Sequence, residues 1–159
     1  MDICLYISMA VALAYLCLSA AVVRGVPVSL SSTFYSLGRF GWVFQLSLAA
    51  IAFTLVPVWI SHSSEGYECL PFLSCASLLF VASAPSFRME LEGKVHYSAA
   101  AVCCTCGILW QFLEGLWDAT LWFACLGLTL SLGNLSKWCW WLEVCVIGSV
   151  LYNLYRLVV

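Results

Sequence analysis

Arg88-Met-Glu-Leu-Glu-Gly-Lys-Val-His96 is the most polar stretch of the chain. It holds four of the 14 charged residues and one of the two histidines, and the residues on either side are almost all apolar. Charged side chains are costly inside a bilayer, so a chain that crosses a membrane leaves it where such residues cluster. The stretch therefore predicts a membrane surface, and the apolar runs that flank it are candidate spans.

The composition as a whole also points to lipid. Of the 159 residues, 64% are hydrophobic and 9% are charged, and the mean hydropathy is +1.02. A soluble domain carries roughly 25% charged residues, so this chain has too little polar surface to cover a globule in water. The length suits one helical domain, residues 1–159. The net charge of −2 and the lack of a basic tract argue against nucleic acid as a partner.

The apolar runs predict an all-α polytopic membrane protein, a bundle of about six transmembrane helices. Each run approaches the ~20 residues that a helix needs to cross hydrocarbon. The predicted spans are residues 3–23, 40–60, 69–86, 95–113, 119–133 and 138–158. We expect the first to be a retained helix and not a signal peptide, because no basic residue precedes it. Five spans remain an alternative, in which 95–113 and 119–133 form one bent unit.

The loops between these spans carry an uneven charge. With six spans, one side receives five basic residues and the other receives Arg156 alone; the five are Arg24, Arg39, Arg88, Lys94 and Lys137. Basic residues in short loops mark the cytoplasmic side. We therefore expect loops 24–39 and 87–95 in the cytoplasm and both termini outside it. Pro27 and the hydroxyl-rich segment after it predict turns and caps in the first loop.

A polar site is predicted near the cytoplasmic side. Glu143 lies inside the sixth predicted span, level with His96 at the start of the fourth, and a charged residue at such a depth is a functional candidate. Arg39 and Lys94 reach the same level and can neutralise the carboxylate. The pair suits a proton relay or a headgroup-binding site. The alternative is a polar staple between helices, or a carboxylate that reaches the membrane surface.

A second candidate site is the pair Glu114 and Asp118. The two are four residues apart, so they share a face if one helix runs through both. Paired carboxylates can exchange protons or bind a cation, whereas carboxylates in a surface loop are usually just solvated. The ten cysteines lie mostly in apolar runs, and Cys103, Cys104 and Cys106 do not follow a metal-binding spacing. No catalytic residue, metal or cofactor is predicted.

The first loop also carries a resemblance. Pro27-Val-Ser-Leu-Ser-Ser-Thr-Phe-Tyr35, followed later by Val95-His96 at a helix start, resembles segments of small multi-pass membrane proteins of bacteria. The resemblance implies a location in the bacterial inner membrane and groups Ser29, Ser31, Tyr35 and His96 on the cytoplasmic side. It supplies no activity and no substrate.

Three functions follow as hypotheses. The first is a small integral membrane protein that acts through lipid or protein contacts in the bilayer, without catalysis. The second is a small transporter or channel subunit that uses Glu143 and His96. The third is an intramembrane enzyme that modifies lipid, with His96 and Ser29 or Ser31. Expected partners are the lipid bilayer, a lipid or small solute, and a second copy of the chain.

Overall fold

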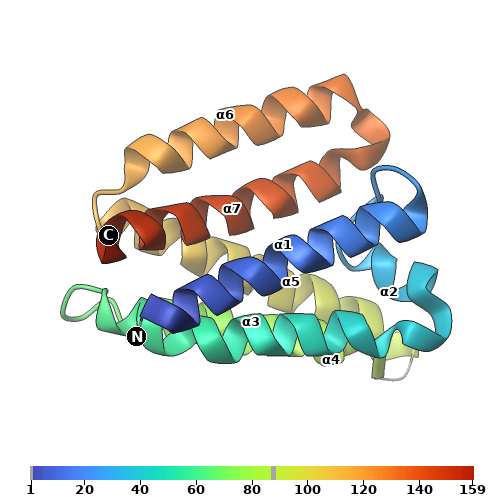
Figure 1. Ribbon diagram of the computed structural model, residues 1–159, viewed down its shortest axis with the longest axis horizontal. Coiled ribbons are helices and arrows are strands. Elements are labelled where there is room, and N and C mark those ends of the chain that lie inside the picture. Colours follow the sequence, from blue (N-terminus) through green and yellow to red (C-terminus); the bar gives the residue numbers. More distant parts are fainter. Residues whose placement is uncertain (1, 87–88) are drawn as a thin grey trace.

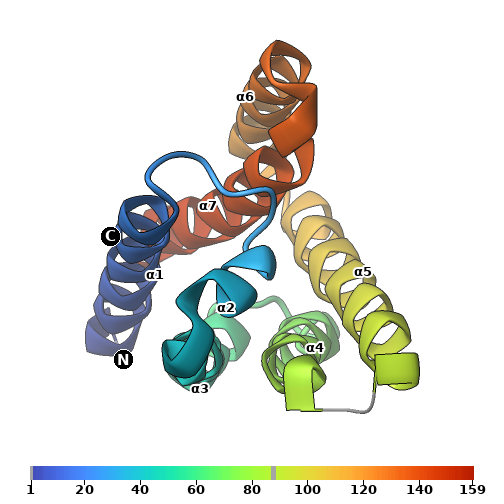
Figure 2. The ribbon, with the colours of Figure 1, turned by 90° about the vertical axis from the view of Figure 1, so that its right-hand side faces the viewer.

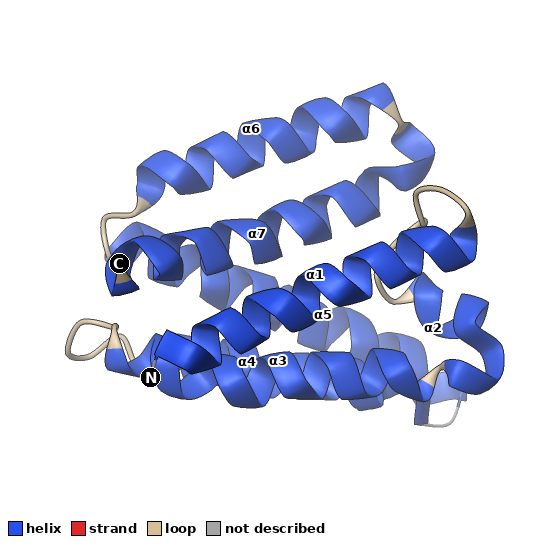
Figure 3. Ribbon diagram, in the orientation of Figure 1, coloured by secondary structure: helices blue, strands red, loops and turns tan. Residues whose placement is uncertain are grey.

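The computed structural model describes residues 2–86 and 89–159, and over these residues its regular structure consists of helices joined by short loops, without a strand (Figure 3). The predicted all-α class is confirmed. The α-helices are α1 (Asp2–Val23), α2 (Ser32–Leu37), α3 (Trp42–Ser61), α4 (Cys69–Ser83), α5 (Met89–Leu113), α6 (Trp117–Gly133) and α7 (Trp138–Val158). Short 3₁₀ turns, Gly38–Phe40, Ala84–Ser86 and Leu135–Lys137, adjoin α3, α4 and α7.

Four of the described helices are long and apolar enough to cross a membrane, which is consistent with an integral membrane protein. The candidate spans are Ile3–Val23, Trp42–Ser61, Gly93–Leu113 and Leu135–Val158. Helices α4 and α6 contain 15 and 17 residues. At 1.5 Å per residue they rise about 23 and 26 Å, less than the ~30 Å of a hydrocarbon core. Gly115, at φ 74°, lies between α5 and α6, which are therefore separate helices.

Two predicted loops are partly wrong. Arg88 lies outside the described residues, but α5 begins at Met89, so residues 89–94 are helical and not part of a loop that ends at 95. The 25 residues of α5 rise about 38 Å, more than a bilayer core needs, so its charged first turns can extend beyond the hydrocarbon.

The second correction is the helix α2 inside the predicted loop 24–39. It follows a turn with reciprocal bonds: the Ser32 backbone N–H donates to Ser29 Oγ and the Ser29 N–H donates to Ser32 Oγ, both at 3.1 Å. These bonds close a turn just before the helix, whose N-cap residue Ser31 makes no side-chain cap bond. The hydroxyl-rich segment was expected to form turns and caps, and the structure adds a short helix after the turn.

Five helices, α1, α3, α4, α5 and α7, surround the interior of the molecule (Figure 2). α6 lies outside this ring and packs mainly on α7, while α2 and the loop before it lie across one end. Both termini lie at the opposite end (Figure 1). α6 and α7 approach closely because glycines face the partner helix: a Cβ on Gly127 would lie 3.1 Å from the Cys145 Cβ.

Candidate functional site

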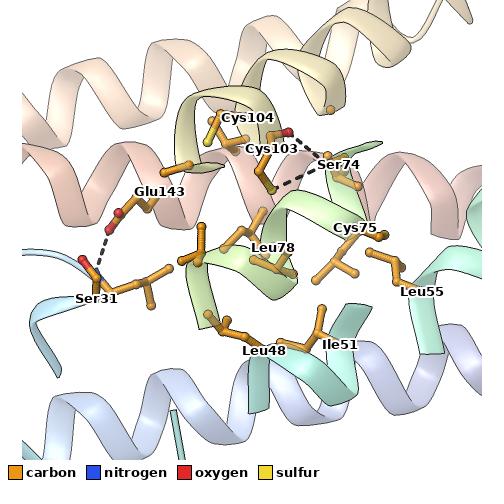
Figure 4. A pocket seen from close by; sticks show the side chains of 18 of the residues that line it. Ser31, Leu48, Ile51, Leu55, Ser74, Cys75, Leu78, Cys103, Cys104 and Glu143 are labelled. Atoms are coloured by element: carbon orange, nitrogen blue, oxygen red, sulfur yellow. Dashed lines mark hydrogen bonds between the residues drawn. The ribbon is translucent and has the colours of Figure 1, made fainter. Parts of the chain in front are cut away.

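A cavity of about 100 Å³ lies inside the ring, between α3, α4, α5 and α7 (Figure 4). Its wall is almost entirely apolar. The lining includes Phe44, Leu48, Ile51, Leu55 and Trp59 from α3, Leu78 and Val81 from α4, Ala100 and Gly107 from α5, and Val146, Ile147, Val150 and Leu151 from α7. The lining residues with polar side-chain atoms or thiols are Ser31, Trp59, Ser74, Cys75, His96, Cys103, Cys104 and Glu143. Trp59 Nε1 is buried and has no hydrogen-bond partner among the described residues.

Glu143 marks one end of the cavity, where the first loop meets α7. Its Oε2 accepts the backbone N–H of Leu30 at 2.7 Å, and its carboxylate also interacts with the Cys139 thiol. A second bond fixes the same loop, because the Trp140 backbone N–H donates to the Val28 carbonyl at 3.2 Å. The glutamate therefore holds the segment that covers this end of the cavity.

The structure brings three of the predicted site residues to this cavity: Glu143, His96 and Ser31. The His96 ring packs edge-on against Tyr97, with the ring centroids 5.7 Å apart. Ser31 Oγ lies 3.2 Å from the hydroxyl of Ser29, which is the fourth predicted residue nearby. Their proximity has a simple origin, because the first loop, α5 and α7 all reach the same end of the bundle.

Two other predicted residues, Arg39 and Tyr35, do not line the cavity. The Arg39 guanidinium is exposed and lies over the Phe40 ring, 4.7 Å from its centroid. The Tyr35 side chain is 65% exposed. Tyr35 lies in α2 and Arg39 in the 3₁₀ turn Gly38–Phe40 that follows it, and both side chains are exposed. Arg39 is therefore not placed to neutralise Glu143.

The second predicted site does not assemble. α5 ends at Leu113 and α6 begins at Trp117, so Glu114 and Asp118 do not share a helical face. Glu114 accepts the backbone N–H and the hydroxyl of Ser64, both at 2.6 Å, and ties two loops together. Asp118, just before the predicted span 119–133, pairs with Arg156 at 2.9 Å. The hydrogen bond from that guanidinium lowers the pKa of Asp118 from its usual 3.8.

The sequence reasoning missed a buried amide cluster at the other end of α7. Asn153 Nδ2 donates to Gln111 Oε1 at 2.7 Å, and the Thr120 hydroxyl donates to the same oxygen at 2.9 Å. Asn153 and Gln111 are 0% exposed and belong to α7 and α5, whereas Thr120 belongs to α6. The sequence did carry a signal for this cluster: Gln111 and Asn153 are amides within apolar runs, and such amides are expected to bond across helices.

The interior role of Trp59 was also missed. It lies near the end of α3, where tryptophans of membrane helices commonly face the membrane–water interface, yet it is 2% exposed and lines the cavity. Its ring packs edge-on against Trp110, with centroids 5.3 Å apart, and Trp110 Nε1 donates to Ser63 Oγ at 2.8 Å. Trp59 therefore lines the interior cavity and is not part of an aromatic belt at the membrane surface.

Three thiols lie in the cavity wall: Cys75, Cys103 and Cys104. The Ser74 hydroxyl donates to the Cys103 carbonyl at 2.9 Å and lies 3.6 Å from its sulfur. All ten cysteines are free thiols, so Cys69 and Cys75 form no bridge. Within residues 2–86 and 89–159 no group of three or more potential ligands is placed to hold a metal ion.

Comparison with family models, with curated proteins and with solved structures finds no match for this chain. The resemblance to small bacterial membrane proteins therefore stays a prediction. The site is a mainly apolar cavity, and the groups toward the first loop are the Glu143 carboxylate, the His96 imidazole and the Ser31 hydroxyl. That arrangement can bind an apolar body and orient a polar end.

Proposed function

We propose that this protein is an integral membrane protein that binds a lipid-like or other small apolar molecule between its helices, without catalysis. The observation that carries the proposal is the cavity of about 100 Å³ inside the helix ring. Protein interiors are close-packed, and voids larger than a water molecule are few. An engineered apolar cavity of about 150 Å³ stays dry and binds benzene, so a space of this size and lining suits an apolar guest.

Six spans remain our proposal for the membrane topology. α4 and α6 are short for a bilayer core, but α4 continues into the turn Ala84–Ser86, and local thinning accommodates a short span. Arg24, Arg39, Lys94 and Lys137 lie at the end of the bundle covered by α2, and Arg156 lies at the end that holds the termini. This asymmetry supports a cytoplasmic α2 end, with both termini outside. A bacterial inner membrane is the location that the resemblance of the first loop implies.

Transport is the second candidate, and a specific observation favours it: Glu143 and His96, two groups that can exchange protons, line one cavity. Proton relays in membranes use such residues. The lining beyond that end is apolar, and it offers few partners for the water chain that a solute path needs. We therefore place binding ahead of transport.

Ala100 and Ala101 provide a test of the proposed binding. Ala100 lines the cavity, and its neighbour Ala101 is exposed on the outside of α5. The protein would be purified in mild detergent, and molecules that co-purify would be identified by mass spectrometry. We expect Ala100→Leu to fill the cavity and lose a bound apolar molecule that the wild type and Ala101→Leu both retain. Equal retention by the two variants, or no apolar molecule in any of the three, contradicts the proposal.

A further inference from the structure

The charge of the cavity is one-sided. Among the described residues that line it, Glu143 is the only acidic side chain, and none is a lysine or an arginine. The thiols that interact with this carboxylate, those of Cys139 and Cys104, carry no positive charge, and the one imidazole in the lining is that of His96. Phe44 and Trp59 add aromatic rings to the wall, and such rings attract cations and not anions. The cavity therefore discriminates against an anionic guest.

The cavity is also elongated along the bundle. Its lining on α7 runs from Glu143 to Leu151, a rise of about 12 Å. The lining therefore follows the helix axis, a direction along which an extended alkyl chain can lie. Figure 4 shows Glu143 and Ser31 at one end and Leu55 and Cys75 at the other. The end with Glu143 lies beneath the loop before α2, and the lining extends away from it as far as Trp59 near the end of α3.

The Glu143 carboxylate has acceptor capacity beyond its protein contacts. Two carboxylate oxygens offer about four lone-pair sites. The contacts described for Glu143 are the Leu30 N–H and the Cys139 thiol. A donor on a ligand can therefore bond to the carboxylate while Leu30 keeps its place, with the Ser31 hydroxyl as a further acceptor at the same end.

We propose that the ligand is a single-chain amphiphile whose head is a primary amine, with the ammonium beside Glu143 and the alkyl chain extending along α7. This inference rests on the proposed function and adds the chemical class of the ligand. A carboxylate and a buried ammonium stabilise each other, whereas a fatty-acid carboxylate would place two like charges together. A two-chain aminophospholipid fits less well, because its phosphate lies next to the ammonium and its second chain has no space.

Three eight-carbon probes test the head group at constant chain length: octylamine, 1-octanol and octanoate. The full chain would be placed in phosphatidylcholine nanodiscs, and radiolabelled octylamine retained above empty nanodiscs would be displaced by each unlabelled probe. A charge-assisted hydrogen bond contributes about 1.5–3 kcal/mol, so we expect octylamine to bind roughly tenfold or more tightly than octanol, and octanoate to bind most weakly.

Two variants locate the effect. We expect Glu143→Gln, with its monodisperse fold checked by size-exclusion chromatography, to bring octylamine down to the affinity of octanol. Glu65→Gln, in the exposed loop at the far end, is the matched control and should leave all three affinities unchanged. If octanoate or octanol displaces the label from the wild type as effectively as octylamine does, the proposed amine head group is wrong, but binding of an apolar molecule is still supported. If none of the three probes, each labelled in turn, is retained above empty nanodiscs, the proposed function is overturned as well.

Discussion

Asn153 Nδ2 lies 2.7 Å from Gln111 Oε1, so two fully buried amides join α7 to α5 in a region where neither can bond to water. The Thr120 hydroxyl of α6 bonds to the same oxygen. α6 contacts the rest of the molecule mainly through α7, and this cluster is therefore a polar link from α6 to the helix ring. It fixes how α5, α6 and α7 meet.

Removing the Thr120 hydroxyl should weaken this link. Thr120→Val keeps the shape of the side chain but deletes the bond to Gln111, and we expect a loss of about 1 kcal/mol in the free energy of unfolding. Thr129→Val is the control, because Thr129 is exposed on the same helix and bonds only within it. Its effect should stay within about 0.5 kcal/mol. Unfolding in detergent, followed by circular dichroism, measures both. If both variants lose the same stability, the interhelical bond contributes nothing beyond the change in helix propensity that valine causes at both positions.

The close approach of α6 and α7 depends on Gly127. A Cβ there would lie 3.1 Å from the Cys145 Cβ, so Gly127→Leu has no room and should destabilise the protein by about 1–3 kcal/mol. At the end of the same helix, a Cβ on Gly133 meets nothing within 4 Å. Gly133→Leu should therefore leave the stability unchanged in the same unfolding measurement by circular dichroism. A stable Gly127→Leu variant would mean that α6 does not pack on α7 as described.

The Asp118–Arg156 pair predicts a specific pH dependence. Hydrogen bonding to Arg156 lowers the pKa of Asp118 below 3.8 in the folded protein. A lowered pKa gives stability that is present above the unfolded value and is lost as the pH falls through the folded value. We expect Asp118→Asn to lower the stability slightly at neutral pH, and only slightly because both side chains are exposed. The difference between the two proteins should vanish as the pH falls through the folded pKa of Asp118. Thermal unfolding of both proteins between pH 2 and 7 measures the difference; a difference that stays the same at every pH would contradict the prediction.

The sequence could predict most of the helices because their signal is local. Runs of apolar residues identify α1, α3 and α7 almost to the residue. The charges at Glu114 and Asp118 favour a break between α5 and α6, and the structure places that break at Gly115. The apolar runs did not reveal α2, because it is a helix of six residues that follows a turn closed by two serine hydroxyls and not an apolar run.

The candidate site was predictable only in its charged part. Glu143 and His96 stand out in apolar runs, since charge in a membrane is unexpected, and the charge asymmetry of the loops put them at the same level. The cavity itself is formed by apolar side chains from four helices, and no single run distinguishes Trp59 or Leu55 from a residue that faces lipid. Which face of each helix turns inward is decided by packing between distant segments.

The contact between Glu143 and Leu30 predicts the behaviour of the end cap. Glu143→Leu leaves the Leu30 N–H without its acceptor, and a buried donor that loses its partner costs about 1–3 kcal/mol. The segment 26–31 should then open more often, and its amides should exchange with deuterium faster, by roughly tenfold or more. Glu143→Gln keeps an acceptor at the same position and should show a smaller increase. Glu65→Leu, at the opposite end of the bundle, should leave the exchange unchanged. Hydrogen–deuterium exchange resolved to this peptide makes the comparison, and unchanged exchange in Glu143→Leu would mean that the Val28–Trp140 bond alone holds the loop.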